Sequence, residues 1–409
     1  MLAGSPAIRL QGDDMPGAFD GIRILDLTTM VSGPMACMIL ADQGADVIKI
    51  EAPRGDQMRA LGPAHKGMSG GFFSCNRGKK SVSLDLKTDA GKAVLRDLIA
   101  SADVLVQNFR PGAIDRMGFG EADVRAIRSD ILYVSMSGFG DAGPYSHKRV
   151  YDPVIQALTG ATDVQADRKT GRPQMFQVII ADKVTALTAA QAISAGLFAR
   201  ARTGAGQHIR LSMLDALIAF FWPEQMATLN FVGQEKDPAE FRSGMDLIYE
   251  TKDGYITVGA VSDAEWKGLC TVLGKPEWIE DPRFREAGPR MRNVGIRKEL
   301  CAAEMARWSS EALLAALNEA DVPSAPLLTR YDLLDDEQVK ANGLLIVDEY
   351  GTLGPVRQPR PVAQFDGTPS RIRGAAPFLG EHNRAVLSEL GYDEDRLEQL
   401  ERSGVLSGG

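Results

Sequence analysis

Alternating strand-like and helix-like segments near the start of the chain limit its possible folds more than any other feature. Residues 22–29 read IRILDLTT, which is typical of a buried strand, and residues 31–45 then carry Pro34 at a position suited to a first helical turn. A second apolar segment, ADVIKIE, occupies residues 45–51. Strand, helix and strand within about 30 residues form the unit that builds a parallel sheet by a right-handed crossover. This stretch therefore predicts an α/β fold.

The same alternation continues through the first half of the chain. SVSLDL at 81–86 is followed by a helical pattern at 87–102, by DVLVQNF at 103–109 and by the apolar segment ILYVSMSGFG at 131–140. A long helical pattern then begins at Ala181. We therefore expect a mostly parallel sheet covered by helices.

Changes in composition predict a second, smaller domain. Residues 233–244 are rich in Gly, Pro and charged residues and read as a linker, and LIYETKDGYITVGA at 247–260 reads as a hairpin that turns at Asp253 and Gly254. The Pro-rich segment 356–370 implies an extended return. We predict a large α/β domain at 18–228, a small α+β domain at 229–332, and a return segment with C-terminal helices at 333–409 that packs on the large domain.

Charge and cysteine content exclude several classes of partner and compartment. The 46 Lys and Arg against 54 Asp and Glu give a net charge of −8, which does not favour nucleic acid. The apolar stretch 184–199 is too short for a bilayer span, and the N-terminal residues do not read as a secretory signal. Four cysteines without CxxC spacing argue against disulfides and structural zinc. We expect a cytoplasmic protein without a membrane span or a metal.

One familiar motif is present but out of context. Residues 138–143 match GxGxxG after an expected strand, yet Pro144 and Tyr145 follow where a dinucleotide-binding helix should begin. We therefore reject a nicotinamide site. P-loop and HExxH motifs do not occur in the sequence.

Several segments, in order, resemble the class III coenzyme A transferases, the family of formyl-CoA transferase, carnitine CoA-transferase and α-methylacyl-CoA racemase. They are LADQGADVIKIEAPRGDQMR, FFSCNRGKKSVSLDLKT, DVLVQNFRPGAIDRMG, VSMSGFGDAGPY, YDPVIQALTG, ADKVTALTAAQAISAGLFARARTGAGQHIRLSMLDAL and LGEHNRAVLSELGY. The resemblance implies a Rossmann-like large domain, an open-ring chain and an interlocked homodimer. It also implies transfer of coenzyme A from an acyl-CoA donor to a carboxylic acid, with acyl-CoA as substrate and no prosthetic group.

By this resemblance, Asp182 is the catalytic carboxylate. It would attack the thioester to give a mixed anhydride and then carry coenzyme A as an aspartyl thioester. From the residue alone, an Asp before a long helix is equally a helix cap that accepts backbone N–H groups. Those donors and the helix dipole predict a lowered pKa, which favours the anionic oxygen that attacks a thioester.

The resemblance also singles out Tyr151 and Asp152. The racemase branch has His before Asp, whereas this chain has Tyr151, and a phenol with an ordinary pKa of about 10 is a poor base for α-proton exchange. Transfer is therefore favoured over the alternative of an acyl-CoA racemase. Asp152 matches a second acid that positions the site, although an Asp before Pro153 is also a common turn residue. A non-catalytic CoA-binding protein is the remaining alternative.

Six residues match the family's contacts with coenzyme A, which are Lys87, Asn108, Phe109, Arg110, Arg116 and Arg149. Lys87 and Arg116 also read as solvated helix ends. The basic cluster NRGKK, with Arg77, Lys79 and Lys80, reads either as a phosphate contact or as a solvated surface. The chain departs from formyl-CoA transferase where Thr29, Val31 and Ala52 replace its CoA contacts, so formyl or oxalyl specificity is not predicted.

Overall fold

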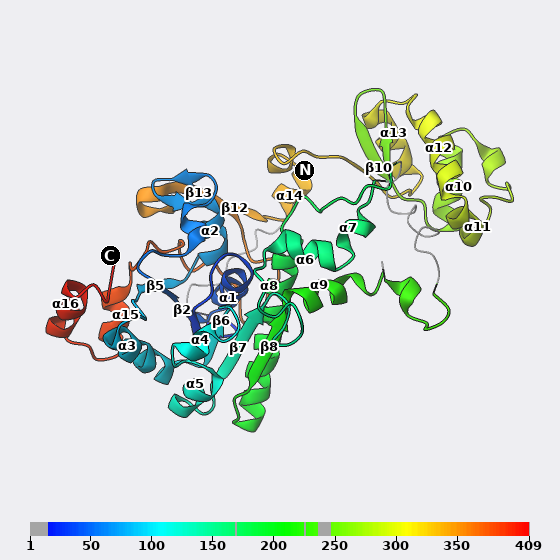
Figure 1. Ribbon diagram of the computed structural model, residues 1–409. Coiled ribbons are helices and arrows are strands. Elements are labelled where there is room, and N and C mark those ends of the chain that lie inside the picture. The colour runs from blue at the N-terminus through cyan, green and yellow to red at the C-terminus, as the bar shows by residue number, and fades with distance from the viewer. Residues whose placement is uncertain (1–14, 168–169, 225, 236–246, 409) are drawn as a thin grey trace. The chain divides into compact units, whose positions relative to one another are not determined.

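A computed structural model describes residues 15–167, 170–224, 226–235 and 247–408 (Figure 1). The chain divides into two compact units, of which the larger comprises Met1–Trp222 with Gly343–Gly409 and the smaller comprises Pro223–Asn342. The first 14 residues and residues 236–246, which include most of the expected linker, lie outside the described residues.

The large unit is built on a six-stranded sheet in which every pair of neighbouring strands is parallel. The strand order is β5 (Lys80–Ser83), β2 (Asp46–Glu51), β1 (Arg23–Asp26), β6 (Val104–Gln107), β7 (Leu132–Ser137) and β8 (His208–Ser212). The predicted α/β fold with a parallel sheet is confirmed. The strand order reverses between β1 and β6, and ligands of such sheets bind beyond the carboxyl ends of the strands at that point.

Two apolar layers cover the sheet, one on each face, because successive side chains along a strand point to opposite faces. On β1, Ile24 packs in the layer that includes α1 and α8, whereas the next residue, Leu25, packs in the layer that includes α3, α5, α15 and α16. These helices span Ser32–Asp42 (α1), Ile180–Thr203 (α8), Asp89–Ala100 (α3), Glu121–Ile127 (α5), Asn383–Glu389 (α15) and Glu394–Arg402 (α16). Both faces of the sheet are therefore buried, as a parallel sheet requires.

Shorter elements complete the large unit. They are the hairpin of β3 (Ala64–His65) and β4 (Met68–Ser69), the helices α2 (Gly70–Asn76), α4 (Ala113–Arg116), α6 (Asp152–Leu158), α7 (Ala161–Val164) and α9 (Met213–Phe221), and the hairpin of β12 (Leu345–Tyr350) and β13 (Gly354–Pro359). The β12–β13 hairpin packs on α2, where the rings of Phe73 and Tyr350 meet edge to face at 5.8 Å. The rejected GxGxxG segment lies in the loop before α6.

The small unit has its own antiparallel sheet and core. Its strands are ordered β11 (Ser324–Pro326), β10 (Tyr255–Val258) and β9 (Ile248–Glu250), with helices α10 (Asp263–Val272), α11 (Ala287–Arg292), α12 (Val294–Met305), α13 (Ser310–Glu319) and α14 (Glu337–Ala341). The predicted hairpin is confirmed, since Thr251 N–H donates to the Gly254 carbonyl at the turn. Trp266 and Phe284 lie in the core with ring centroids 5.7 Å apart.

Within the part of the chain that the structure describes, none of the helices has both the length and the apolar composition needed to span a bilayer. In the same residues, His, Cys, Asp and Glu side chains do not gather in groups of three or more that could hold a metal ion. The four cysteines, all of them described, are buried free thiols.

Candidate active site

Asp182 lies in the first turn of α8, as its third residue. The helix begins at Ile180, one residue before the predicted start, and Ile179 occupies the N-cap position without a side-chain hydrogen bond. The expectation that Asp182 caps the helix is therefore wrong. Its carboxylate is half-buried and is not used to satisfy the first N–H groups of its own helix.

A second helix start meets Asp182. Ser32 is the first residue of α1, and its backbone N–H and side-chain hydroxyl lie close enough to the Asp182 carboxylate to stabilise its charged form. The long helices α1 and α8 pack against each other in the apolar layer described above. The N-terminal ends of two helices, each with a partial positive charge, therefore lie next to one carboxylate.

The pKa of Asp182 is raised to about 6, which corrects the lowered pKa expected from the sequence. Burial is the main cause, the negative charge of Asp152 adds to it, and the hydrogen bonds from Ser32 act in the opposite direction. The expectation considered only the local helix start. It missed the desolvation and the second carboxylate, both of which come from tertiary packing.

Asp152 connects α6 to the start of α8. It is buried as the first residue of α6, and its Oδ2 accepts the backbone N–H of Asp182 at 3.1 Å. Its Oδ1 accepts from Gln156 Nε2 at 2.5 Å, and the same amide donates to the Val178 carbonyl at 3.1 Å. Tyr151 precedes Asp152, and its side chain is 60% exposed. Asp152 therefore orders the backbone that carries Asp182.

The loop between β1 and α1, residues 27–31, meets the loop that follows β6. Asn108 Oδ1 accepts the backbone N–H of Thr29 at 3.0 Å, and Asn108 Nδ2 donates to the Thr29 carbonyl at 2.9 Å. This paired contact bridges the point at which the strand order reverses. The Asp182 carboxylate, the starts of α1 and α8, and the loops after β1 and β6 thus gather at the carboxyl edge of the sheet.

Known proteins are similar to this chain in sequence and in fold. Residues 19–383 match the model of CoA-transferase family III. The chain is 34% identical to a succinyl-CoA:glutarate CoA-transferase of Mus musculus, over 99% of this chain and 95% of the mouse protein. The chain belongs to CoA-transferase family III. The transferase moves coenzyme A between an acyl-CoA and a carboxylic acid.

Two further relatives support the assignment of the transferase. A succinate–glutarate CoA-transferase of Agrobacterium fabrum is 33% identical over 92% of this chain and 97% of that protein. The crystal structure of a CAIB/BAIF family protein from Brucella suis matches with a TM-score of 0.80 and 32% identity, over 92% of this chain and 100% of the other. The α/β fold described above is therefore the fold of the family.

The six residues expected to bind coenzyme A all follow the carboxyl ends of β5, β6 or β7. Lys87, Arg110, Arg116 and Arg149 are exposed, as a phosphate-binding side chain must be before its ligand arrives. Phe109 packs partly buried against the apolar layer of α3 and α5. Asn108 is engaged with Thr29, so its side chain shapes the loops of the transferase in addition to any contact with a ligand.

Arg77 and Lys79 of the NRGKK cluster do not lie on a solvated surface, and their charges are used in buried ion pairs. Arg77 is buried and pairs with Asp42 at 2.7 Å. Lys79 is buried and pairs with Asp26 at 2.7 Å. Lys80 pairs with Asp46 at 3.0 Å. Both readings from the sequence are wrong for Arg77 and Lys79, because their partners come from other elements of the large unit.

Two residues of the site were not expected from the sequence. Ser32 lies two residues before Pro34, and Ser and Pro close together are a signal for the start of a helix. That signal predicts the start of α1 but not that Ser32 lies beside Asp182. Gln156 lies four residues after Asp152 on α6, a spacing that brings two side chains together on one helix face. Neither signal indicates which other helix lies nearby.

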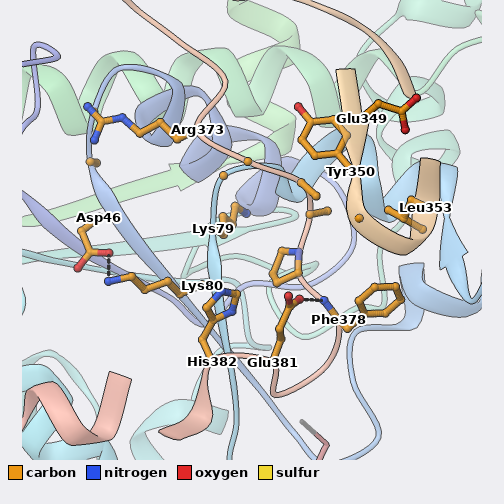
Figure 2. A pocket seen from close by; sticks show the side chains of 18 of the residues that line it. Asp46, Lys79, Lys80, Glu349, Tyr350, Leu353, Arg373, Phe378, Glu381 and His382 are labelled. Carbon is orange, nitrogen blue, oxygen red and sulfur yellow. Dashed lines mark hydrogen bonds and ion pairs between the residues drawn. The ribbon is translucent and has the colours of Figure 1, made fainter. Parts of the chain in front are cut away.

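A cavity of about 1080 Å³ lies at the opposite edge of the same sheet (Figure 2). It is lined by Asp46 and Lys80 at the amino ends of β2 and β5, by the β12–β13 turn and by residues 373–378 with Glu381 and His382. Lys80 is paired with Asp46, and Arg373 lies 3.8 Å from Asp20. The cavity is therefore separate from the carboxyl edge at which Asp182 lies.

Proposed function

We propose that Asp182 is the nucleophile that carries coenzyme A between the two acids. A carboxylate oxygen attacks the thioester carbonyl, the C–S bond breaks, and a mixed anhydride and the CoA thiolate form. The thiolate then attacks the Asp182 carbonyl of the anhydride, which releases the donor acid and leaves an aspartyl-CoA thioester. The acceptor carboxylate reverses both steps and restores the free carboxylate.

The position of Asp182 between two helix starts is the observation that best supports this role. Each step exchanges a carboxylate for a thiolate, so charge is conserved and no proton has to be transferred. The N–H and hydroxyl of Ser32 stabilise the charged form of Asp182, and the residue is only half-buried, which supports access by a substrate. Asp152 supports the same turn through the Asp182 N–H. We propose that Tyr151 has no role in proton transfer.

The test is a transfer assay with Asp182→Asn. Succinyl-CoA is incubated with a panel of free acids, and the new acyl-CoA species are measured by mass spectrometry. We expect kcat to fall about 10⁴-fold, because the amide cannot form the anhydride. Hydroxylamine should modify Asp182 of the unsubstituted enzyme during turnover. Deuterium uptake at Cα without exchange of coenzyme A would support a racemase instead.

Asp215 offers a matched control. It also occupies the third position of a helix, α9, but it is exposed. Asp215→Asn should keep the rate of the unsubstituted enzyme. Full activity of Asp182→Asn would eliminate the proposed nucleophile.

We also propose that the donor is succinyl-CoA and the acceptor a short dicarboxylic acid such as glutarate. The names of the mouse and Agrobacterium relatives support this substrate class. A site that binds the second carboxylate of the acceptor with a polar or charged group should prefer glutarate to the monoacid pentanoate by at least about tenfold in kcat/KM. Equal rates with the two acids would contradict the proposal.

We further propose that the six residues after β5, β6 and β7 bind coenzyme A. We also propose that two open-ring chains interlock as a homodimer in the cytoplasm. Large exposed apolar side chains on α8 and α9, namely Leu187, Phe198 and Phe220, support a partner surface. Light scattering should give twice the chain mass of 44.2 kDa. Cell fractionation tests the proposed cytoplasmic location. Arg116→Ala should bind coenzyme A more weakly than the unsubstituted enzyme, which tests the proposed CoA contacts.

A further inference from the structure

The backbone of the β1–α1 loop is held by buried charged side chains. Asp26 Oδ1 accepts the N–H of Thr28 at 2.9 Å, and Lys49 Nζ donates to the Thr28 carbonyl at 2.8 Å. The two oxygens of Asp56 lie 3.1 and 3.2 Å from the N–H of Met30. Asn108 makes two hydrogen bonds with the backbone of Thr29. Side chains therefore hold the backbone of three consecutive loop residues, Thr28, Thr29 and Met30.

Met30 has a conformation that such contacts must maintain. Its φ is 71°, in the left-handed region that a residue with a side chain seldom adopts. Such a backbone persists only where the surrounding structure over-determines it. The loop leads into α1 at Ser32, two residues after Met30 and beside the Asp182 carboxylate.

Lys49 and Asp56 form an ion pair inside the large unit. Their side chains are both 0% exposed, the pair distance is 3.1 Å, and the Phe72 ring lies 5.9 Å from the ammonium group. Burying two charges costs as much as their attraction returns, so an apolar pair of similar volume is often no less stable. Stability alone therefore does not account for this pair.

We propose that Lys49 and Asp56 are positioning residues of the transferase, which hold the β1–α1 loop so that the start of α1, with Ser32, lies beside the Asp182 carboxylate. The proposal rests on the proposed role of Asp182 as the nucleophile. Lys49 donates to the Thr28 carbonyl, and Asp56 accepts the Met30 N–H. The ion pair between Lys49 and Asp56 keeps both side chains in place for these contacts. Neither residue needs to touch a substrate.

The ionisation of Asp182 reports on this arrangement. The titratable groups facing it are Asp152 on α6 and the Cys75 thiol on α2, whose own pKa is raised by burial and, to a smaller extent, by Asp182. Ser32 stabilises the anion. If the loop moves, this stabilisation is lost, and the acid limb of the pH profile of kcat/KM moves to higher pH.

The experiment compares two double variants that leave no unpaired buried charge. Lys49→Met with Asp56→Ala removes every side-chain contact of the pair with the loop. We expect kcat/KM to fall about 100-fold, mostly in kcat, and the acid limb to move to higher pH. Lys49→Met with Asp56→Asn keeps an oxygen for the Met30 N–H but not the Lys49 contact with Thr28, and should recover only part of the loss. Asp56→Glu keeps the charge but displaces its oxygens, and should move the limb in the same direction if the alanine variant does not fold.

A buried ion pair of the same kind provides the control. Arg77 and Asp42 pair at 2.7 Å, with Asp42 at the far end of α1. Arg77→Met with Asp42→Ala should change the melting temperature but leave the acid limb in place. A limb that stays in place in the folded Lys49 and Asp56 variants, or that moves equally in the control, would overturn the proposal.

The Asp182→Asn variant separates this inference from the proposed function. If Asp182→Asn is inactive and the Lys49 and Asp56 variants keep the original pH profile, the positioning role fails and the nucleophile stands. If Asp182→Asn retains full transfer activity, the proposed nucleophile itself fails.

Discussion

Asp152 is the first residue of α6, and its carboxylate accepts the backbone N–H of Asp182 in the first turn of α8, so the Asp182 carboxyl depends on Asp152. Asp152 accepts the N–H of Asp182, and its charge raises the pKa of the Asp182 carboxyl beyond the effect of burial. A pKa of about 6 leaves most of the group ionised at pH 7. It also gives a more nucleophilic oxygen than an ordinary carboxylate has, because nucleophilicity follows basicity. The pair therefore favours attack on a thioester.

This pairing predicts the pH dependence of transfer. Because the ionised form of Asp182 is the proposed nucleophile, kcat/KM should fall as the pH drops through about 6. Asp152→Asn removes the neighbouring negative charge, so the acid limb should move to lower pH. The measurement is kcat/KM against pH for both enzymes, with Asp215→Asn as the control. An upward displacement of the limb in Asp152→Asn would contradict the assigned cause.

Helix α1 carries its first turn close to the preceding loop, and that approach depends on a glycine. A Cβ added to Gly33 would lie 2.4 Å from Cβ of Thr28, whose backbone is itself held by Asp26 and Lys49. Thr28 is fully buried and cannot give way. The lack of a side chain at Gly33 therefore allows the loop and the start of α1 to lie together, with Ser32 towards Asp182.

Gly33→Ala should disturb both stability and activity. We expect the free energy of unfolding to fall by about 1–3 kcal/mol through overpacking, with a loss of kcat because Ser32 is displaced. Urea unfolding and the transfer assay measure the two effects. Gly70→Ala, where an added Cβ would lie 3.7 Å from the Pro63 carbonyl oxygen in ordinary contact, is the control. Equal effects of the two substitutions would show that the close approach does not matter.

Across the whole large unit, charged side chains are buried in pairs that join distant segments. Lys79, beyond α2, pairs with Asp26 on β1, and Arg77 pairs with Asp42 and also donates to the Pro359 carbonyl of β13. Burial raises the pKa of Asp26, but the charges of Lys79 and Lys49 outweigh it and lower the pKa to about 2. The return segment is thus held partly by a hydrogen bond from a buried arginine, and the buried ion pairs link the stability of this unit to pH.

The unit should therefore lose stability in acid. A carboxyl whose pKa is lowered on folding stabilises the protein above its unfolded pKa of about 3.8, and that contribution is lost as the pH falls towards 2. Lys79→Met should cost about 3–5 kcal/mol and move the midpoint of acid unfolding to higher pH, because Asp26 then protonates more easily. Circular dichroism during acid titration measures the midpoint. An unchanged midpoint in a folded variant would argue against this linkage.

Local patterns were sufficient for the elements whose residues lie close together in the chain. The strand, helix and strand of 22–51 and the hairpin at Asp253 and Gly254 formed where the periodicity and turn residues predicted them. The transferase family was predicted from the resemblance of several ordered segments and is confirmed. The importance of Asp182 came from that resemblance, since an acid at a helix start is also common in unrelated proteins.

Ionisation and burial could not be read from the same patterns. The amino-acid order alone specified where strands, helices and turns form, because those preferences act between neighbours within a few residues. The raised pKa of Asp182, the buried partners of Lys79 and Arg77, and the hold of Lys49 and Asp56 on the β1–α1 loop arose only when separate segments packed together. Electrostatic energies depend on distance and on exclusion of water, and both are properties of the folded chain.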